Sequence, residues 1–204
     1  MTITTTQISG RISRKKERTT QIIIDAAMSL FAKQGIDATT MEQIAEEADV
    51  AKGTLYNYFP VKEAIISAYI QRAFATQNDA RLSHLEGLPD TRSRMEYVFT
   101  ELIQGVQKQP DLFARYLVYR TKTIVAVSQN DDAPSGIHLL AQRIIELGQQ
   151  NGEIRTDLPL YTLEDLFEFT FIEVVKQLAK DGEAITAQQA ISGCVDIFIN
   201  GATS

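Results

Sequence analysis

The side chains with the clearest potential chemistry lie between residues 52 and 58, in the run Lys-Gly-Thr-Leu-Tyr-Asn-Tyr. Apart from Leu55, this run offers a charge, hydrogen-bond donors and acceptors, and one residue without a side chain. Short polar side chains suit base-pair edges, lysine suits phosphate, and glycine lets a backbone approach a ligand closely. A short helix with such an outer face fits the major groove of DNA.

The preceding residues predict a second short helix that braces this face from behind. Thr40 and Gln43 form a capping box, so this helix is expected to begin at about Met41. Its apolar residues recur three or four positions apart and mark a buried side: Ile44, Ala45 and Ala48. The small Ala45 allows another helix to cross at close range.

A tight turn is expected to join the two helices. Asp49 lies at the turn and tolerates a left-handed backbone better than most residues. Val50 and Leu55 should point inward, and Pro60 forces Phe59 out of the helical region and ends the segment. The alternative is an amphipathic helix pair whose polar side is merely solvated.

These residues resemble the DNA-binding domain of the TetR (tetracycline-repressor) family. The run from Lys52 to Phe59, followed by Lys62 and Glu63, is similar to the recognition helix of that family. The upstream match consists of Ile22, Ala26, Ala27, Leu30, Phe31, Gly35, Thr39 and Thr40, so the likeness covers about the first 65 residues. Two positions depart from the family pattern: Asp49, where Gly is commoner, and Pro60, where Lys, Ser or Asn is commoner.

The resemblance implies a helix-turn-helix domain that binds double-stranded DNA. We expect the DNA contacts to come from both short helices and from Lys62, which would act as a phosphate counter-charge. The expected contact residues are Thr40, Gln43, Lys52, Gly53, Thr54, Tyr56, Asn57, Tyr58 and Lys62.

The charge distribution supports DNA binding by the N-terminal part of the chain, although the net charge is −6. Residues 1–75 hold nine Lys or Arg against eight Asp or Glu, whereas residues 76–204 hold eleven against eighteen. Placement matters more than the total for phosphate binding. A basic arm precedes the first expected helix and is either a solvated tail or a contact to the DNA backbone or minor groove: Arg11, Arg14, Lys15, Lys16 and Arg18.

Composition excludes several classes of protein. No apolar run approaches the roughly 20 residues of a membrane span, and the N-terminus does not resemble a secretory signal. The single cysteine cannot form an internal disulfide, so we expect a reducing, cytoplasmic location. Two histidines and Cys194 are too few for the usual zinc site, and Cys194 is expected in a core or an interface. No Gly-rich phosphate loop or nucleophile elbow occurs, so we expect neither an enzyme nor a cofactor.

Helical periodicity recurs throughout, and strand signals are nearly absent, which predicts an all-α fold of about nine helices. After the first helix (17–34), whose buried side should include Ile22, and the two short helices, helices are expected at 61–84, 91–108, 110–127, 137–151, 161–180 and 187–200. Residues 87–90 and 130–136 should be loops, and Thr186 with Gln189 should cap the last helix. We expect a DNA-binding head at 1–60, a hinge helix at 61–84, and an effector-binding and dimerisation body over 61–204.

The two last helices are apolar around too much of their circumference for one buried stripe. They are either an ordinary intramolecular core or, as the resemblance implies, the interface of a homodimer. A two-fold dimer would place its recognition helices about 34 Å apart, on successive turns of a palindromic DNA site.

The resemblance also implies an unknown small-molecule effector, bound between the hinge helix and the body, that separates the two DNA-binding heads. Aromatic and polar residues of the body are candidate contacts, although each also suits core filling: Phe74, Phe99, Phe113, Tyr116, Tyr119, His138, Glu168 and Phe171. Glu168 lies between two phenylalanines, where a carboxylate could hold a cationic ligand or be paired within the protein. The sequence thus predicts a ligand-responsive transcriptional regulator, most simply a repressor. The alternative is a helical ligand-binding or interaction protein that has lost DNA binding.

Overall fold

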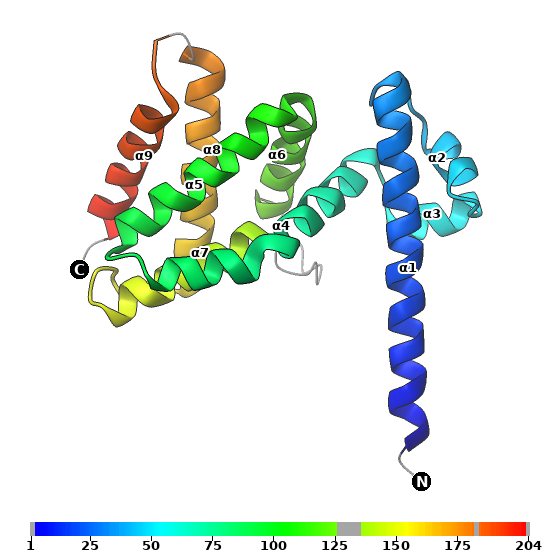
Figure 1. The fold of residues 1–204 in the computed structure, drawn as a ribbon, viewed down its shortest axis with the longest axis horizontal. Helices are drawn as coiled ribbons and strands as arrows, with labels where there is room; N and C mark the ends of the chain where they lie inside the picture. The colour runs from blue at the N-terminus through cyan, green and yellow to red at the C-terminus, as the bar shows by residue number, and fades with distance from the viewer. Residues whose placement is uncertain (1–2, 126–135, 182–183, 203–204) are drawn as a thin grey trace. The chain divides into compact units, whose positions relative to one another are not determined.

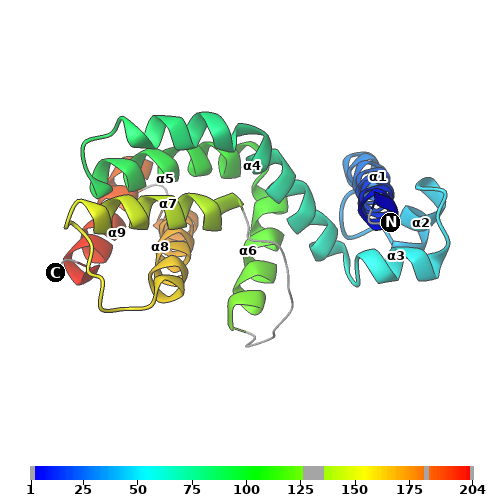
Figure 2. The same cartoon turned by 90° about the horizontal axis from the view of Figure 1, so that it is seen from below.

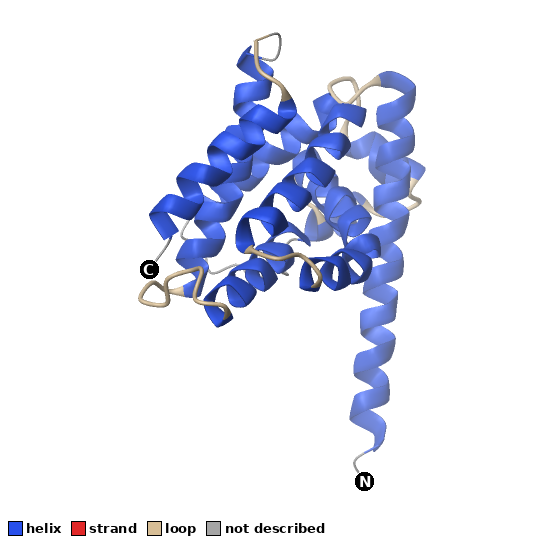
Figure 3. Cartoon of the chain, turned by 60° about the vertical axis from the view of Figure 1, so that its left-hand side comes forward, coloured by secondary structure: helices blue, strands red, loops and turns tan. Residues whose placement is uncertain are grey.

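The computed structural model describes residues 3–125, 136–181 and 184–202, and the described residues contain helices and no strand (Figures 1 and 3). The chain divides into two compact units, Met1–Tyr69 and Ile70–Ser204, which we call the head and the body. The division falls inside one helix, after Tyr69, rather than at residue 60 as the sequence suggested. Within the described residues, no helix is long and apolar enough to cross a membrane.

The head begins with α1 (Ile3–Gln34), which starts well before the predicted residue 17. The basic segment therefore continues the helix, because its Lys and Arg residues are good helix formers and no proline interrupts them. Gly35 ends α1 with a φ of 85°, a conformation that glycine adopts without strain. The expected burial of Ile22 was wrong: it is 42% exposed, whereas Ile24 is only 1% exposed. The buried stripe of α1 is centred on Ile23, Ala27 and Phe31, and Ile22 lies on its solvent side.

Two short helices, α2 (Met41–Glu47) and α3 (Lys52–Tyr58), follow as predicted. The capping box is confirmed: the amide of Thr40 donates to Gln43 Oε1 at 2.9 Å, and the amide of Gln43 donates to Thr40 Oγ1 at 3.2 Å. Asp49 adopts the expected left-handed conformation with a φ of 51°. Helix α4 (Lys62–Glu86) begins in the head and continues into the body.

The described part of the body contains five further helices: α5 (Thr91–Lys108), α6 (Pro110–Val125), α7 (Gly136–Gln150), α8 (Leu160–Asp181) and α9 (Ala187–Ala202). Helices α8 and α9 run side by side, and α5 and α7 pack against them (Figures 1 and 2). Phe99 of α5 lies at the centre of the core, with ring centroids 5.0 Å from Phe167 and 5.4 Å from Phe171. Where they are described, the bounds of these body helices agree with the bounds predicted from the sequence within one or two residues. The predicted loop at 130–136 lies outside the described residues except for Gly136, which begins α7.

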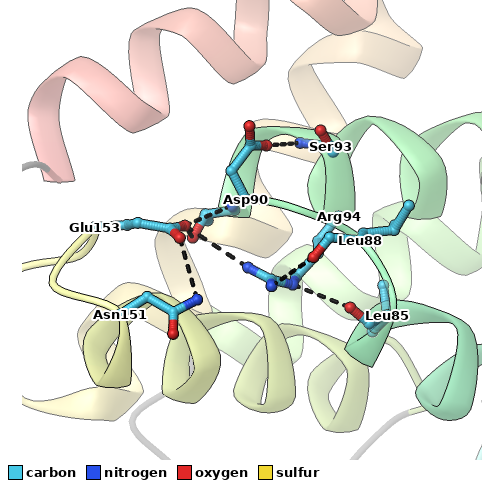
Figure 4. A network of polar contacts seen from close by, with 8 residues as sticks. Leu85, Leu88, Asp90, Ser93, Arg94, Asn151 and Glu153 are labelled. Atoms are coloured by element: carbon cyan, nitrogen blue, oxygen red, sulfur yellow. Dashed lines mark hydrogen bonds and ion pairs between the residues drawn. The ribbon is translucent and has the colours of Figure 1, made fainter.

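A polar network joins the end of α4, the start of α5 and the loop after α7 (Figure 4). Buried Arg94 donates from Nε to the carbonyl of Leu85 at 3.0 Å and from Nη2 to the carbonyl of Leu88 at 2.7 Å. It thereby ties the last turn of α4, which contains Leu85, to the loop that follows the helix, which contains Leu88. Glu153 accepts bonds from the amide of Thr91 at 2.6 Å and from its hydroxyl at 2.5 Å, and it lies 3.6 Å from Arg94 Nη1.

The same network perturbs two carboxyl groups at the start of α5. The amide of Ser93 donates to Asp90, the N-cap of α5, and this bond holds the pKa of Asp90 below its usual value. Burial alone would raise the pKa of Glu153. The hydrogen bonds from Thr91 and Asn151 and the charge of Arg94 outweigh burial, so the pKa of Glu153 is lowered. Charged carboxylates therefore stabilise this junction.

Candidate nucleic-acid interface and effector pocket

Helix α3 presents the polar surface that the sequence predicted. Leu55 is fully buried against the rest of the head, and Phe59, in extended backbone after the helix, is also buried. Tyr56 is 46% exposed. The other predicted contact residues of α3 are exposed or half-buried: Lys52, Gly53 and Asn57 are exposed, and Thr54 and Tyr58 are half-buried. One short helix thus combines a buried anchor with five side chains and one glycine that reach solvent.

Gly53 has no role in packing the head. A Cβ atom built at this position meets nothing within 4 Å, and the residue does not need a positive φ. Glycine inside a helix is nevertheless less favourable than alanine by roughly 0.5–1 kcal/mol. The head therefore carries a destabilising residue that no contact within the described chain requires.

Lys62 has a structural role that the sequence did not disclose. Its ammonium group donates to the carbonyls of Ile36 and Thr39, at 2.7 Å each, in the loop between α1 and α2. Thr39 is itself buried and donates to the carbonyl of Gly35 at 2.8 Å. Since an ammonium group has three donors, these two bonds leave one hydrogen for a phosphate. DNA contact by Lys62 stays a prediction, and bracing of the α1–α2 loop is added to it.

Thr40 and Gln43 are exposed, but their side chains are already occupied by the capping box. Gln43 Oε1 also accepts a bond from Gln34 at 3.1 Å. Lys52 lies 3.9 Å from Glu42 in an exposed ion pair, which contributes little to stability and yields readily to a phosphate. In the basic segment of α1 the side chains of residues 14–18 are exposed; that of Arg11 lies outside the described side chains.

The body contains a small pocket of about 10 Å³, room for roughly one water molecule. Three of the eight predicted effector contacts line it: Tyr116, Glu168 and Phe171. The remaining lining residues were not predicted: Leu117, Arg120, Ile137 and Ile172. The pocket is mainly apolar, with one buried ion pair in its wall.

The other predicted effector contacts lie elsewhere in the body. Phe99 is part of the core described above. Phe74 and Phe113 pack edge to face, with ring centroids 6.4 Å apart. Tyr119 is half-buried and does not line the pocket. His138 is half-buried and lies behind the pocket wall, with Nδ1 3.9 Å from Glu168 and Nε2 3.3 Å from Glu164.

Glu168 is paired within the protein, as one of the two alternatives predicted. Arg120 Nη2 donates to both of its carboxylate oxygens, at 3.1 and 2.8 Å. Burial raises the pKa of Tyr116 above its usual value; the charge of Arg120 opposes this shift and that of Glu168 adds to it. Tyr116 therefore enters the pocket as a neutral phenol. Sequence reasoning also missed the two buried ion-pair partners Arg120 and Glu164, because the residues that they pair with, Glu168 and His138, are distant in the chain.

Comparison with known proteins agrees with the geometry of the head. Residues 23–69 match the family model described as "Bacterial regulatory proteins, tetR family". The transcriptional repressor KstR of Rhodococcus jostii is 35% identical over 96 residues, which cover 47% of this chain and 44% of that protein. The repressor KstR2 of the same organism is 24% identical over 207 residues, covering 96% of this chain and 94% of that protein.

The fold agrees over a longer range. FadR of Thermus thermophilus, a TetR-family repressor solved in complex with lauroyl-CoA, superposes with a TM-score of 0.66 at 22% identity, covering 89% of this chain and 94% of that one. Over residues 23–69 the head is therefore a helix-turn-helix DNA-binding domain of the TetR type, and the chain as a whole is similar to bacterial transcriptional regulators of that family. These relatives are regulators rather than enzymes.

Proposed function

We propose that the protein is a homodimeric repressor that binds a palindromic operator and is released by a small-molecule effector. The observation that carries this proposal is the exposed polar face of α3, anchored from behind by buried Leu55. A short helix held in this way can enter the major groove, with side chains reaching base edges and phosphates. Such a protein acts in the cytoplasm, where its DNA lies.

The exposed apolar residues of α8 and α9 support dimerisation. Leu166 and Phe169 of α8 are 47% and 37% exposed, and Ile197 of α9 is 75% exposed. Gly193 and Gly201 flank Ile197 by one helical turn on each side and have open space where a Cβ would lie. A second copy that packed its own α8 and α9 on this surface would bury these residues and approach the glycines closely.

Relatives support the effector as well as repression. KstR and KstR2 are named repressors, and FadR of T. thermophilus was solved with lauroyl-CoA bound. In the proposed mechanism the effector binds the body more tightly in the form that cannot engage both half-sites. A coupling of roughly 1–3 kcal/mol then changes operator affinity by about 5- to 150-fold.

Selection of bound fragments from random duplex DNA tests the proposal. The expected product is a palindrome whose half-sites lie about one helical turn apart. Analytical ultracentrifugation of the same protein should give the mass of a dimer. Recovery of no enriched sequence, with the protein folded and dimeric, would contradict the proposal and favour a helical ligand-binding protein that has lost DNA binding.

A further inference from the structure

Helix α8 buries two carboxylates one turn apart, of which Glu168 lines the pocket and Glu164 does not. Glu164 is 5% exposed and Glu168 is 6% exposed. A buried carboxylate is costly unless a cation or several hydrogen-bond donors compensate its charge. The surroundings of these two residues therefore indicate which ligands the pocket can accept.

Negative charge outweighs positive charge around these carboxylates. Arg120 Nη2 donates to both carboxylate oxygens of Glu168, and His138 lies 3.3 Å from Glu164. Among the described residues, Arg120, His138 and Arg143, which lies 4.0 Å from Glu146, face four carboxylates: Glu164, Glu168, half-buried Asp165 and Glu146. Burial and the three neighbouring carboxylates raise the pKa of Glu164, and only His138 opposes them. Burial, followed by the charge of Glu168, likewise raises the pKa of Asp165.

The remaining wall of the pocket is aromatic or aliphatic. Tyr116 and Phe171 supply ring surfaces, and Leu117, Ile137 and Ile172 supply aliphatic surface. A cation with an apolar body would find the carboxylate of Glu168 for its charge and ring surfaces for its apolar part. An anion would have to compete with Glu168 for Arg120 and would add a further negative charge to the cluster.

We propose that the effector of this protein is an organic cation, an amine with an aromatic or aliphatic body, whose charged group is held by Glu168 and further stabilised by the negative charge of Glu164 one helical turn away. This inference rests on the proposed function, because it names the chemical class of the effector. Since the pocket has a volume of about 10 Å³, the amine must displace side chains to enter. In this proposal the amine competes with Arg120 for Glu168, because both are cations and Arg120 is paired with Glu168 in the pocket wall. Binding then favours a rearranged body, as release from DNA requires.

Two matched sets of compounds test this charge preference. The aromatic set is 2-phenylethylamine, 2-phenylethanol and 3-phenylpropanoate, and the aliphatic set is hexylamine, hexanol and heptanoate. Thermal unfolding and calorimetry are measured with the full chain at pH 7 and constant ionic strength. In at least one set the amine should raise the melting temperature saturably and bind about tenfold or more tightly than its neutral and anionic counterparts. Equal or tighter binding of the counterparts, or no binding of either amine, would overturn the proposal.

Two substitutions on α8 assign the site. Glu164→Gln removes one buried charge with little change of shape and should weaken amine binding about tenfold or more. Glu173→Gln is the matched control, because Glu173 lies on the same helix but is paired with Lys176 at the surface. Its amine affinity should equal that of the unsubstituted protein. An equal loss in both variants, or in neither, would contradict the assigned site.

Measurements of DNA binding distinguish a failure of the proposed function from a failure of the proposed effector class. A gel shift without amine measures operator binding alone, and its failure would contradict the proposed function whatever the amine does. If operator binding is intact and the amine binds at Glu164, added amine should release the DNA. Retention of the DNA by the amine-saturated protein would overturn the effector role of this site.

Discussion

The head and the body each keep residues that work against stability, but they keep them in different places. In the head the residue is Gly53, which lies on an exposed helix where no neighbour needs it. In the body the residues are Glu164 and Asp165, whose burial raises their pKa values among further carboxylates. Residues that cost stability without a compensating contact are expected at functional sites. The comparison teaches that the proposed DNA-binding surface of the head is exposed, whereas the proposed effector site of the body is buried.

The largest expected effect is the difference in stability between a substitution of the buried anchor of α3 and a substitution on its outer face. Leu55→Ala opens a cavity in the core of the head and should lower its stability by about 2–5 kcal/mol. Asn57→Ala on the exposed side should leave the urea midpoint unchanged and weaken DNA binding. Urea denaturation followed by circular dichroism measures the first quantity, and a gel shift measures the second. Similar stability losses in both variants would show that the outer face is structural.

Substitutions of two lysines of the head should likewise differ in their effect on stability. Lys62→Ala removes two charge-assisted hydrogen bonds and should cost about 1.5–3 kcal/mol of stability in addition to any phosphate contact. Lys52→Ala loses only an exposed ion pair and should cost less than about 1 kcal/mol. It should also reduce the slope of log affinity against log salt by about 0.9. An unchanged slope would remove Lys52 from the phosphate contacts.

Much of the head could be predicted because its signals are local in sequence. The capping box of Thr40 and Gln43, the turn at Asp49 and the stop at Gly35 each act within a few residues. The role of Lys62 could not be predicted, because its partners lie 26 and 23 residues earlier in the chain. The burial of Ile24 in place of Ile22 was missed because both fit a helical period, and only tertiary packing of the head distinguishes them.

The body could be predicted as helices but not as a site. Pro110, Thr186 and the break at 87–90 marked the helix ends correctly. The pairing of Arg120 with Glu168 joins residues 48 positions apart, and no local pattern selects one arginine from several. Aromatic residues such as Phe99 fit a core and a pocket equally well by type. Their division between the two depends on side-chain packing, which periodicity does not specify.

A smaller effect concerns the hydroxyl of Tyr56. Tyr56→Phe leaves the exposed ring in place and removes one hydrogen-bonding group. Operator binding should weaken by about 0.5–1.5 kcal/mol, or roughly two- to tenfold, while the melting temperature stays unchanged. Fluorescence anisotropy titration of a labelled operator measures this difference. Overlapping titration curves would exclude the hydroxyl as a DNA contact.

The smallest expected effect is a pH dependence that distinguishes buried from exposed carboxylates. Because the pKa of Glu164 is raised on folding, its contribution to stability is greatest below the usual glutamate pKa and is lost as pH rises through the folded value. Glu164→Gln should therefore gain stability relative to the unsubstituted protein as pH rises from about 4 to 7.

Glu173→Gln should show the opposite sign. A hydrogen bond from Lys176 lowers the pKa of Glu173, so its charged form adds stability above the usual glutamate pKa and loses it as pH falls through the folded value. The variant should lose slight stability relative to the unsubstituted protein as pH rises, because Glu173 is exposed. Thermal unfolding of both variants across this pH range gives the two slopes. Slopes of the same sign would contradict the assigned environments.

The most direct test of the DNA-reading role of α3 is Gly53→Ala, with stability and operator affinity measured on the same preparation. The added methyl group has open space within the head, and Gly53 lies in the first turn of α3, so stability should stay unchanged or rise by less than about 1 kcal/mol. Operator affinity should fall by about tenfold or more, because a methyl group is expected to clash where the backbone approaches DNA closely. A variant that is at least as stable and binds its operator as tightly as before would contradict the account.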